Sequence, residues 1–114
     1  MQKLADQTLW ISSAMFRERT GLSSQALEAA LLAKRIFAVE LQGQTCLPNF
    51  YLDERYDRHR LESVCKVLGD LPGGSKLQFF TNPRGSLGGR TPLDALADGK
   101  VALVRRAAQA FVGG

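Results

Sequence analysis

The chain has 114 residues, of which 45% are hydrophobic and 23% are charged, with a formal net charge of +4 and a pI near 9.4. This composition is typical of one small globular domain, or two subdomains that share a core. No apolar run approaches the roughly 20 residues that span a bilayer, and the first ten residues, which suit two helical turns, lack the apolar stretch of a signal peptide. We therefore expect a cytoplasmic protein without membrane contact.

Two helices joined by a glycine turn are predicted near the N-terminus. The first runs over residues 11–19, capped by Ser12 or Ser13, and Gly21 suits the left-handed conformation that ends a helix. Ser23 or Ser24 can cap the second, which extends to about residue 34. Its apolar stripe consists of Ala26, Leu27, Ala30 and Leu31. Helix, short glycine turn and helix form the helix-turn-helix pattern.

A β-hairpin is predicted directly after these helices. Residues 35–41 are rich in strand-forming side chains, Gln42-Gly43 is a turn signal, and residues 44–48 form the return strand that Pro48 ends. The helices and the hairpin together predict a winged-helix-like half over residues 1–54.

The C-terminal half, residues 55–114, is predicted to be helical. Asp57 caps a helix over residues 58–69, whose apolar side chains recur at helical spacing. Residues 70–75 have loop composition, and a short helix over residues 75–82 is closed by Pro83. Thr91 and Pro92 open a helix over residues 92–98, and a last helix covers residues 100–111. The fold class is α+β and mostly helical, with a seam near residues 53–57.

Enzyme and metal signatures are not found in the sequence. Cys46 and Cys65 lack the spacing of a zinc site with the single histidine, His59, and we expect them to be buried thiols rather than a disulfide. His59 lies between two arginines on a predicted helix, where a solvated face is expected. We predict a non-enzymatic protein without a cofactor or a metal.

DNA binding is one interpretation of the helix-turn-helix, and a helical hairpin that only packs a core or dimer is the other. Ser24 and Gln25 lie where base contacts usually form. The cations placed to reach phosphates are Arg17, Arg19, Lys34 and Arg35. Residues 1–50, however, carry five basic and four acidic side chains, so this half is nearly neutral.

The basic excess lies in residues 76–114, which carry six basic and two acidic side chains. A solvated helix face, a contact for a protein partner and a nucleic-acid patch are the three interpretations. The glycine pair Gly88-Gly89 could form a phosphate loop, but no Gly-Lys-Ser/Thr follows and a helix precedes it. A turn with a threonine cap and a proline-started helix explains the same residues.

The segment "FFTNPRGSLGGRTPLDALADGKVALVRRAAQAF" resembles the toxin-binding domain of the Xre/MbcA/ParS antitoxins. Members of that family carry an aromatic short helix, an Asn-Pro, a Leu-Gly-Gly-x-Thr-Pro-Leu-like turn and a final helix, and often have tryptophan at the aromatic position. The resemblance covers about a third of the chain. The matching residues are Phe79, Phe80, Asn82, Pro83, Leu87, Gly88, Gly89, Thr91, Pro92 and Leu93.

This resemblance implies that the C-terminal unit binds and neutralises a toxin with a RES domain, which consumes NAD or modifies proteins with its ADP-ribose. It also implies operator DNA as a second partner, and a homodimer. The residues expected to contact the partner are Phe80, Arg90, Leu93, Lys100, Arg105 and Arg106. The alternative is a stand-alone DNA-binding regulator whose C-terminal unit serves dimerisation. A small enzyme or nucleotide-binding protein is a third hypothesis, from another class.

Overall fold

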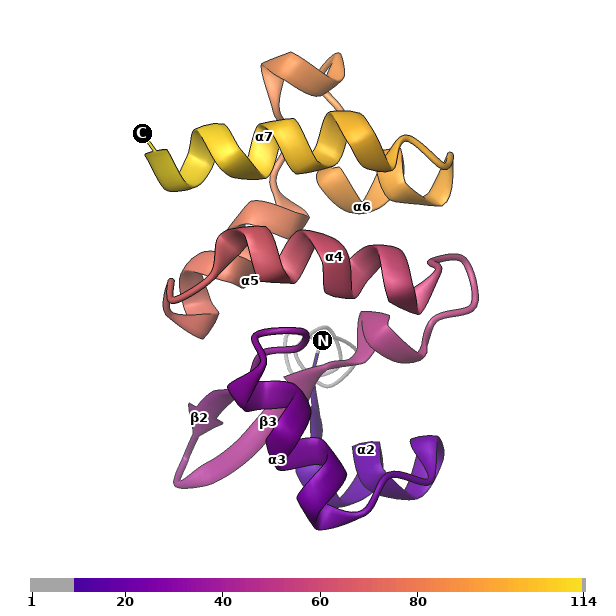
Figure 1. The fold of residues 1–114 in the computed structure, drawn as a ribbon, viewed down its shortest axis with the longest axis vertical. Helices are drawn as coiled ribbons and strands as arrows, with labels where there is room; N and C mark the ends of the chain where they lie inside the picture. Colours follow the sequence, from indigo (N-terminus) through magenta and orange to yellow (C-terminus); the bar gives the residue numbers. More distant parts are fainter. Residues whose placement is uncertain (1–9, 114) are drawn as a thin grey trace.

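A computed structural model describes residues 10–113 and has an α+β, mostly helical fold, as predicted (Figure 1). In Figure 1 the small sheet lies with α2 (Ser13–Thr20) and α3 (Ser24–Leu32) at one end of the molecule, and the later helices are stacked above them. In the part of the chain that is described, no helix is both long and apolar enough to cross a membrane.

The sheet has three antiparallel strands in the order β1-β3-β2: β1 (Trp10–Ser12), β2 (Val39–Leu41) and β3 (Gln44–Pro48). The predicted hairpin is confirmed, and its turn has positive φ at Gln42 and Gly43, 54° and 76°, as in a type I′ turn. β2 begins later than predicted because Ile36 and Phe37 leave the strand and are buried in the core.

β1 was not predicted, and the helix predicted from Ile11 begins only at Ser13. Ile11 pairs with Leu47 of β3, so a partner 36 positions along the chain determines its conformation. Local sequence does not encode such pairing, which explains the error. The predicted helical turns over residues 1–9 lie outside the described residues, and Trp10 is in the strand.

The two helices of the helix-turn-helix have the predicted caps. Ser12 Oγ accepts a hydrogen bond from the Met15 amide, and Gly21 ends α2 with φ 76°. Ser23, rather than Ser24, caps α3 through the Ala26 amide. α3 ends at Leu32, two residues before the predicted end, because Lys34 adopts a left-handed φ of 65°.

The C-terminal half is built from α4 (Arg58–Leu68), α5 (Gly73–Thr81), α6 (Pro92–Ala97) and α7 (Val101–Gly113). The short 3₁₀ helices η1 (Asn49–Leu52) and η2 (Gly85–Leu87) lie in the connections. The caps Asp57 and Thr91 are confirmed by hydrogen bonds from the Arg60 and Asp94 amides. α7 buries Val104 and Ala108, which lie four positions apart and therefore on the same face of the helix.

α5 begins two residues earlier than predicted, because two glycines that suggested a loop are helical. A Cβ on Gly73 would lie 2.4 Å from the carbonyl oxygen of Ala38. Glycine is needed here so that the first turn of α5 can approach the chain before β2. The glycine therefore marks a close tertiary contact rather than a loop.

One hydrophobic core joins the residues on both sides of the predicted seam. The ring of Phe80 from α5 is stacked on that of Phe37, with 6.2 Å between the ring centroids and 3° between the ring planes. The centroid of the Phe80 ring also lies 5.2 Å from that of Phe50 in η1. α4 packs against both η1 and α7, so it forms the centre of the molecule. The two halves thus share their aromatic core.

Candidate functional site

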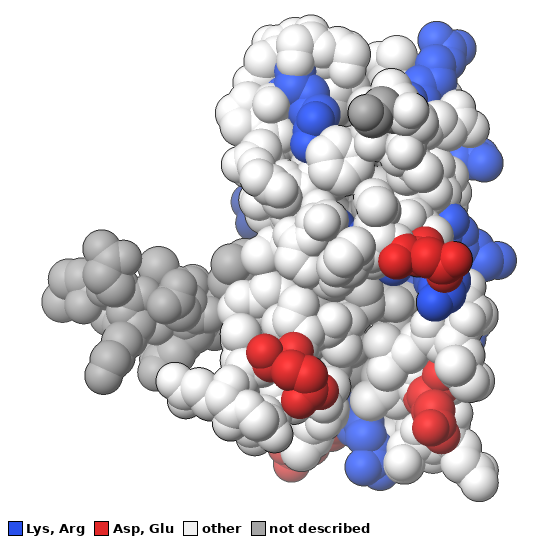
Figure 2. Space-filling model, turned by 90° about the vertical axis from the view of Figure 1, so that its left-hand side faces the viewer, with Lys and Arg blue, Asp and Glu red and all other residues white. Residues whose placement is uncertain are grey.

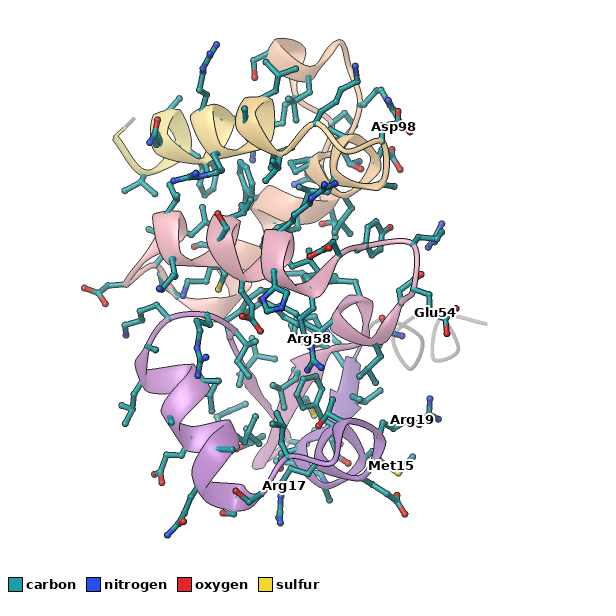
Figure 3. The ribbon with its side chains drawn as sticks, turned by 45° about the vertical axis from the view of Figure 1, so that its right-hand side comes forward. Met15, Arg17, Arg19, Glu54, Arg58 and Asp98 are labelled. Atoms are coloured by element: carbon teal, nitrogen blue, oxygen red, sulfur yellow. The ribbon has the colours of Figure 1, made fainter. Side chains whose placement is uncertain are left out.

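The exposed surface of the helix-turn-helix carries four of the predicted DNA contacts. Ser24 and Gln25 are exposed at the N-terminal end of α3, where the helix-turn-helix fold places base contacts. Figure 3 shows Arg17 and Arg19 on α2 projecting away from the core at the same end of the molecule. α3 itself contains no lysine or arginine, and its single charged residue, Glu28, is exposed.

The other two predicted DNA contacts lie apart from this surface. Lys34 Nζ forms an ion pair with Asp70, 3.1 Å away, on the loop after α4. Arg35 is half-buried, and it lines a depression of about 440 Å³ that α4 and α7 complete. The prediction that Arg35 contacts DNA beside α3 is therefore corrected, because Arg35 lies where the two halves meet, next to α4 and α7.

This depression, the α4–α7 cleft, brings together residues that the sequence analysis assigned to different sites. Arg35 was a predicted DNA contact and Arg105 a predicted partner contact, and both line it. Its other lining residues are His59, Glu62, Ser63, Lys66 and Val67. Positions 59, 62, 63 and 66 recur at helical spacing, so a polar stripe on α4 was detectable in the sequence. Its juxtaposition with Arg35 and Arg105 was not.

Phe80 is a core residue, and its assignment to a partner surface is corrected. Its side chain is 0% exposed and touches the rings of Phe37, Phe50 and Phe79. In the segment that resembles the antitoxins, the aromatic residue Phe80 therefore serves to pack the core. No partner can contact this ring while the fold stays as described.

The Gly88-Gly89 turn is built by backbone hydrogen bonds. The Arg84 amide donates to the carbonyl of Arg90 at 3.0 Å, and the Gly89 amide donates back to the carbonyl of Arg84 at 2.9 Å. Gly88 and Gly89 have φ of 69° and 82°, which favours glycine at both positions. Thr91 then caps α6. The turn interpretation is confirmed in its geometry.

A second depression, the η2–α7 cleft, opens beside this turn with a volume of about 390 Å³. Leu87 and the 43% exposed Leu103 supply its apolar surface, and Arg90 and Lys100 supply its charge. The Arg90 guanidinium is oriented by an ion pair with Asp98 and by the carbonyl of Asp94 at 3.2 Å. Asp98 lies at the upper end of the molecule in Figure 3.

The two remaining predicted partner contacts, Leu93 and Arg106, line neither cleft. Leu93 is half-buried on α6, and Arg106 is exposed on α7. The structure thus brings Arg90 and Lys100 together and separates them from Arg105.

Two buried ionisable groups have shifted pKa values. Burial raises the pKa of the Cys65 thiol above its ordinary 9.0, and burial raises the pKa of the Tyr51 hydroxyl well above 10.0. Both cysteines are buried free thiols, as predicted. The described residues contain no group of three His, Cys, Asp or Glu side chains placed to hold a metal ion.

In comparisons with models of protein families, with curated proteins and with solved structures, no match to the chain was found.

Proposed function

We propose that the chain is a non-enzymatic, antitoxin-like protein that binds a RES-type toxin through its C-terminal helices and operator DNA through its N-terminal half. The observation that supports toxin binding best is the η2–α7 cleft, which the residues of the family-like turn form. The cleft has an apolar centre, and Lys100 at its rim forms no ion pair among the described residues, whereas Arg90 is paired with Asp98. Such a surface suits an acidic protein segment. The proposed contacts within this cleft are Arg90, Lys100 and Leu103, and Leu93 of α6, which does not line the cleft, is a further proposed contact.

Operator binding is supported by the topology of the N-terminal half. A helix-turn-helix followed by a hairpin, in a sheet of order β1-β3-β2, is the arrangement of a winged helix. In this arrangement α3 would enter the major groove with Ser24 and Gln25 first, while Arg17 and Arg19 would reach phosphates. Because α3 has no cation, we expect its DNA affinity to depend on the neighbouring segments.

Co-expression with a RES-type toxin tests the first partner. The wild-type chain should relieve growth arrest and co-purify with the toxin, whereas Leu103→Glu should lose both properties because it places a charge in the cleft. Val112→Glu is the matched control, since Val112 is 45% exposed on the same helix outside the cleft. Equal effects of both substitutions, or no effect of either, would contradict the assignment.

A mobility-shift assay with the promoter of the protein's own gene tests the second partner. We expect a salt-sensitive, sequence-preferring shift that Gln25→Ala weakens by roughly 1–3 kcal/mol, the range for one bidentate base contact. A wild-type chain that causes no shift at low salt would remove DNA from the proposal. The N-terminal half would then serve only as a scaffold.

The stand-alone regulator remains the second candidate, and the exposed apolar residues of α7 favour it. Leu103 and Val112 are 43% and 45% exposed, which would suit contact with a second copy of the chain. Sedimentation equilibrium of the wild type and Leu103→Glu distinguishes the two functions. A dimer that Leu103→Glu dissociates, without capture of a toxin, would support the regulator.

A further inference from the structure

The α4–α7 cleft is formed by three segments that are far apart in the sequence. Arg35 comes from the connection between α3 and β2, His59 and Lys66 come from α4, and Arg105 comes from α7. The cleft has a volume of about 440 Å³, larger than the η2–α7 cleft. It lies where the two halves meet, so only the tertiary structure assembles it.

The cations that line this cleft outnumber the carboxylates that line it. Among the described residues, Arg35, Lys66 and Arg105 form no ion pair within 4.0 Å, although the carboxylate of Glu62 also lines the cleft. The negative charge of Glu62 also contributes, after burial, to the raised pKa values of Tyr51 and Cys65. The cleft therefore keeps an excess of positive charge toward solvent.

One donor of Arg35, a residue that lines the cleft, lacks an acceptor in the described part of the chain. The Arg35 Nε is buried and has no hydrogen-bond partner among residues 10–113. A buried donor without an acceptor is unfavourable, and native proteins rarely leave one unsatisfied. Arginine presents its donors in a planar fork that matches the oxygens of phosphate, and a nearby lysine adds a point charge. These residues thus suit a phosphate group.

We propose that the α4–α7 cleft binds backbone phosphate of duplex DNA, as a second contact of the chain with the operator. This inference rests on the DNA binding proposed above. Figure 1 shows α3, α4 and α7 one above another on the face toward the viewer, along the longest axis of the molecule. That axis measures 36 Å, close to the roughly 34–36 Å of one helical turn of DNA.

The charge distribution agrees with this placement. In Figure 2, lysine and arginine gather along the right-hand edge of the upper part, which is the face toward the viewer in Figure 1. A duplex along this face would meet Ser24 and Gln25 at one end of the molecule and the cleft nearer its centre, beside α4. The cleft supplies the cations that α3 lacks. No Phe, Tyr or Trp lines it for a base to stack on, which favours backbone phosphate over a free nucleotide.

The test compares salt dependence in two matched variants of the full chain. Lys66→Gln/Arg105→Gln removes two cations of the cleft from exposed positions, so the fold should persist. Arg58→Gln removes an exposed cation of α4 that does not line the cleft (Figure 3). Fluorescence anisotropy with a labelled promoter duplex of about two turns measures Kd between about 50 and 200 mM salt.

Each phosphate contact contributes a slope of about 0.9 to log K against log salt. Loss of two contacts should therefore make the weakening between 50 and 200 mM salt about 12-fold smaller, because four raised to the power 1.8 is about 12. Arg58→Gln should change this ratio much less. Arg35→Ala should also weaken binding at low salt, and circular dichroism of each variant checks that it is folded.

Three outcomes would overturn the inference. An unchanged slope in the double variant, while Gln25→Ala still weakens binding, would refute the cleft contact but keep the α3 contact. An equal change of the salt slope in Arg58→Gln would show that the effect comes from the overall charge of the protein and not from contacts in the cleft. The double variant could instead lose saturable binding of ADP or pyrophosphate while its duplex binding stays unchanged. This result would mean that the cleft binds the phosphate of a free small molecule and not that of DNA. Failure of the wild type to bind DNA would instead refute the underlying function.

Discussion

Phe80 allows a direct test of whether the two halves fold as one unit. Its ring is fully buried and lies between the N-terminal residues Phe37 and Phe50 and its neighbour Phe79 on α5. Phe80→Ala removes these contacts and leaves a cavity where both halves meet. Buried phenylalanine-to-alanine substitutions cost about 3–5 kcal/mol.

This loss is large for a chain of this size. At about 0.05–0.15 kcal/mol per residue, the chain's 114 residues give a free energy of unfolding of about 6–17 kcal/mol. With a urea slope of about 2 kcal/mol per molar, a loss of 4 kcal/mol lowers the unfolding midpoint by about 2 M. A variant at the lower end of this range would be partly unfolded in water.

Two probes in the same urea titration make the experiment decisive. Trp10, the single tryptophan, reports on β1, and far-ultraviolet circular dichroism reports mainly on the helices. We expect Phe80→Ala to lower both midpoints together. The control Leu32→Ala, at a side chain that is 75% exposed, should change stability by less than about 0.5 kcal/mol.

Two results would refute this reasoning. A midpoint change below about 0.5 M would mean that Phe80 is not in the core, because the expected loss is several-fold larger. A change in the circular dichroism transition alone would mean that the two halves unfold separately. The second result would favour the division into two domains over a shared core.

Three further predictions concern local interactions. Arg84→Ala should lower stability by about 1–2 kcal/mol, because the Arg84 guanidinium lies 4.9 Å and 4.6 Å from two phenylalanine ring centres, and Arg84→Lys should recover part of the loss in a thermal melt. Ser23→Ala should cost about 1 kcal/mol by removing the cap of α3, whereas Ser24→Ala should cost less; equal losses in urea titrations would contradict this. Stability should fall as pH rises above about 9, because the unfolded chain releases the Cys65 and Tyr51 protons first while burial raises both pKa values in the folded state. Cys65→Ala should make the fall measured by urea titration at pH 8 and 10 shallower, and an unchanged fall would contradict the assignment.

Hydrogen bonds between residues three positions apart were well predicted from sequence. The caps at Ser12, Asp57 and Thr91 each depend on a side-chain oxygen and an amide within the same turn. The hairpin turn at residues 42–43 likewise needs only two residues that tolerate positive φ. These features are local, so the residues involved suffice to predict them.

Contacts between distant segments were not predicted. β1 exists because Ile11 pairs with Leu47, and α5 begins at Gly73 because the backbone of Ala38 passes close to it. The local sequence around a strand-forming residue or a glycine is the same whether or not a distant segment packs against it, so it does not predict such a contact. The sequence therefore determined the pattern of caps and turns, and the tertiary structure decided these two elements.

The candidate sites divide in the same way. Position in the helix-turn-helix was enough to predict that Ser24 and Gln25 are exposed on α3. By contrast, only the packing of the two halves decided that Phe80 is buried and that Arg35 and Arg105 line one cleft. A sequence specifies which side chains are charged or apolar, but their neighbours depend on how segments tens of residues apart come together, because burial and cleft formation are properties of the packed chain.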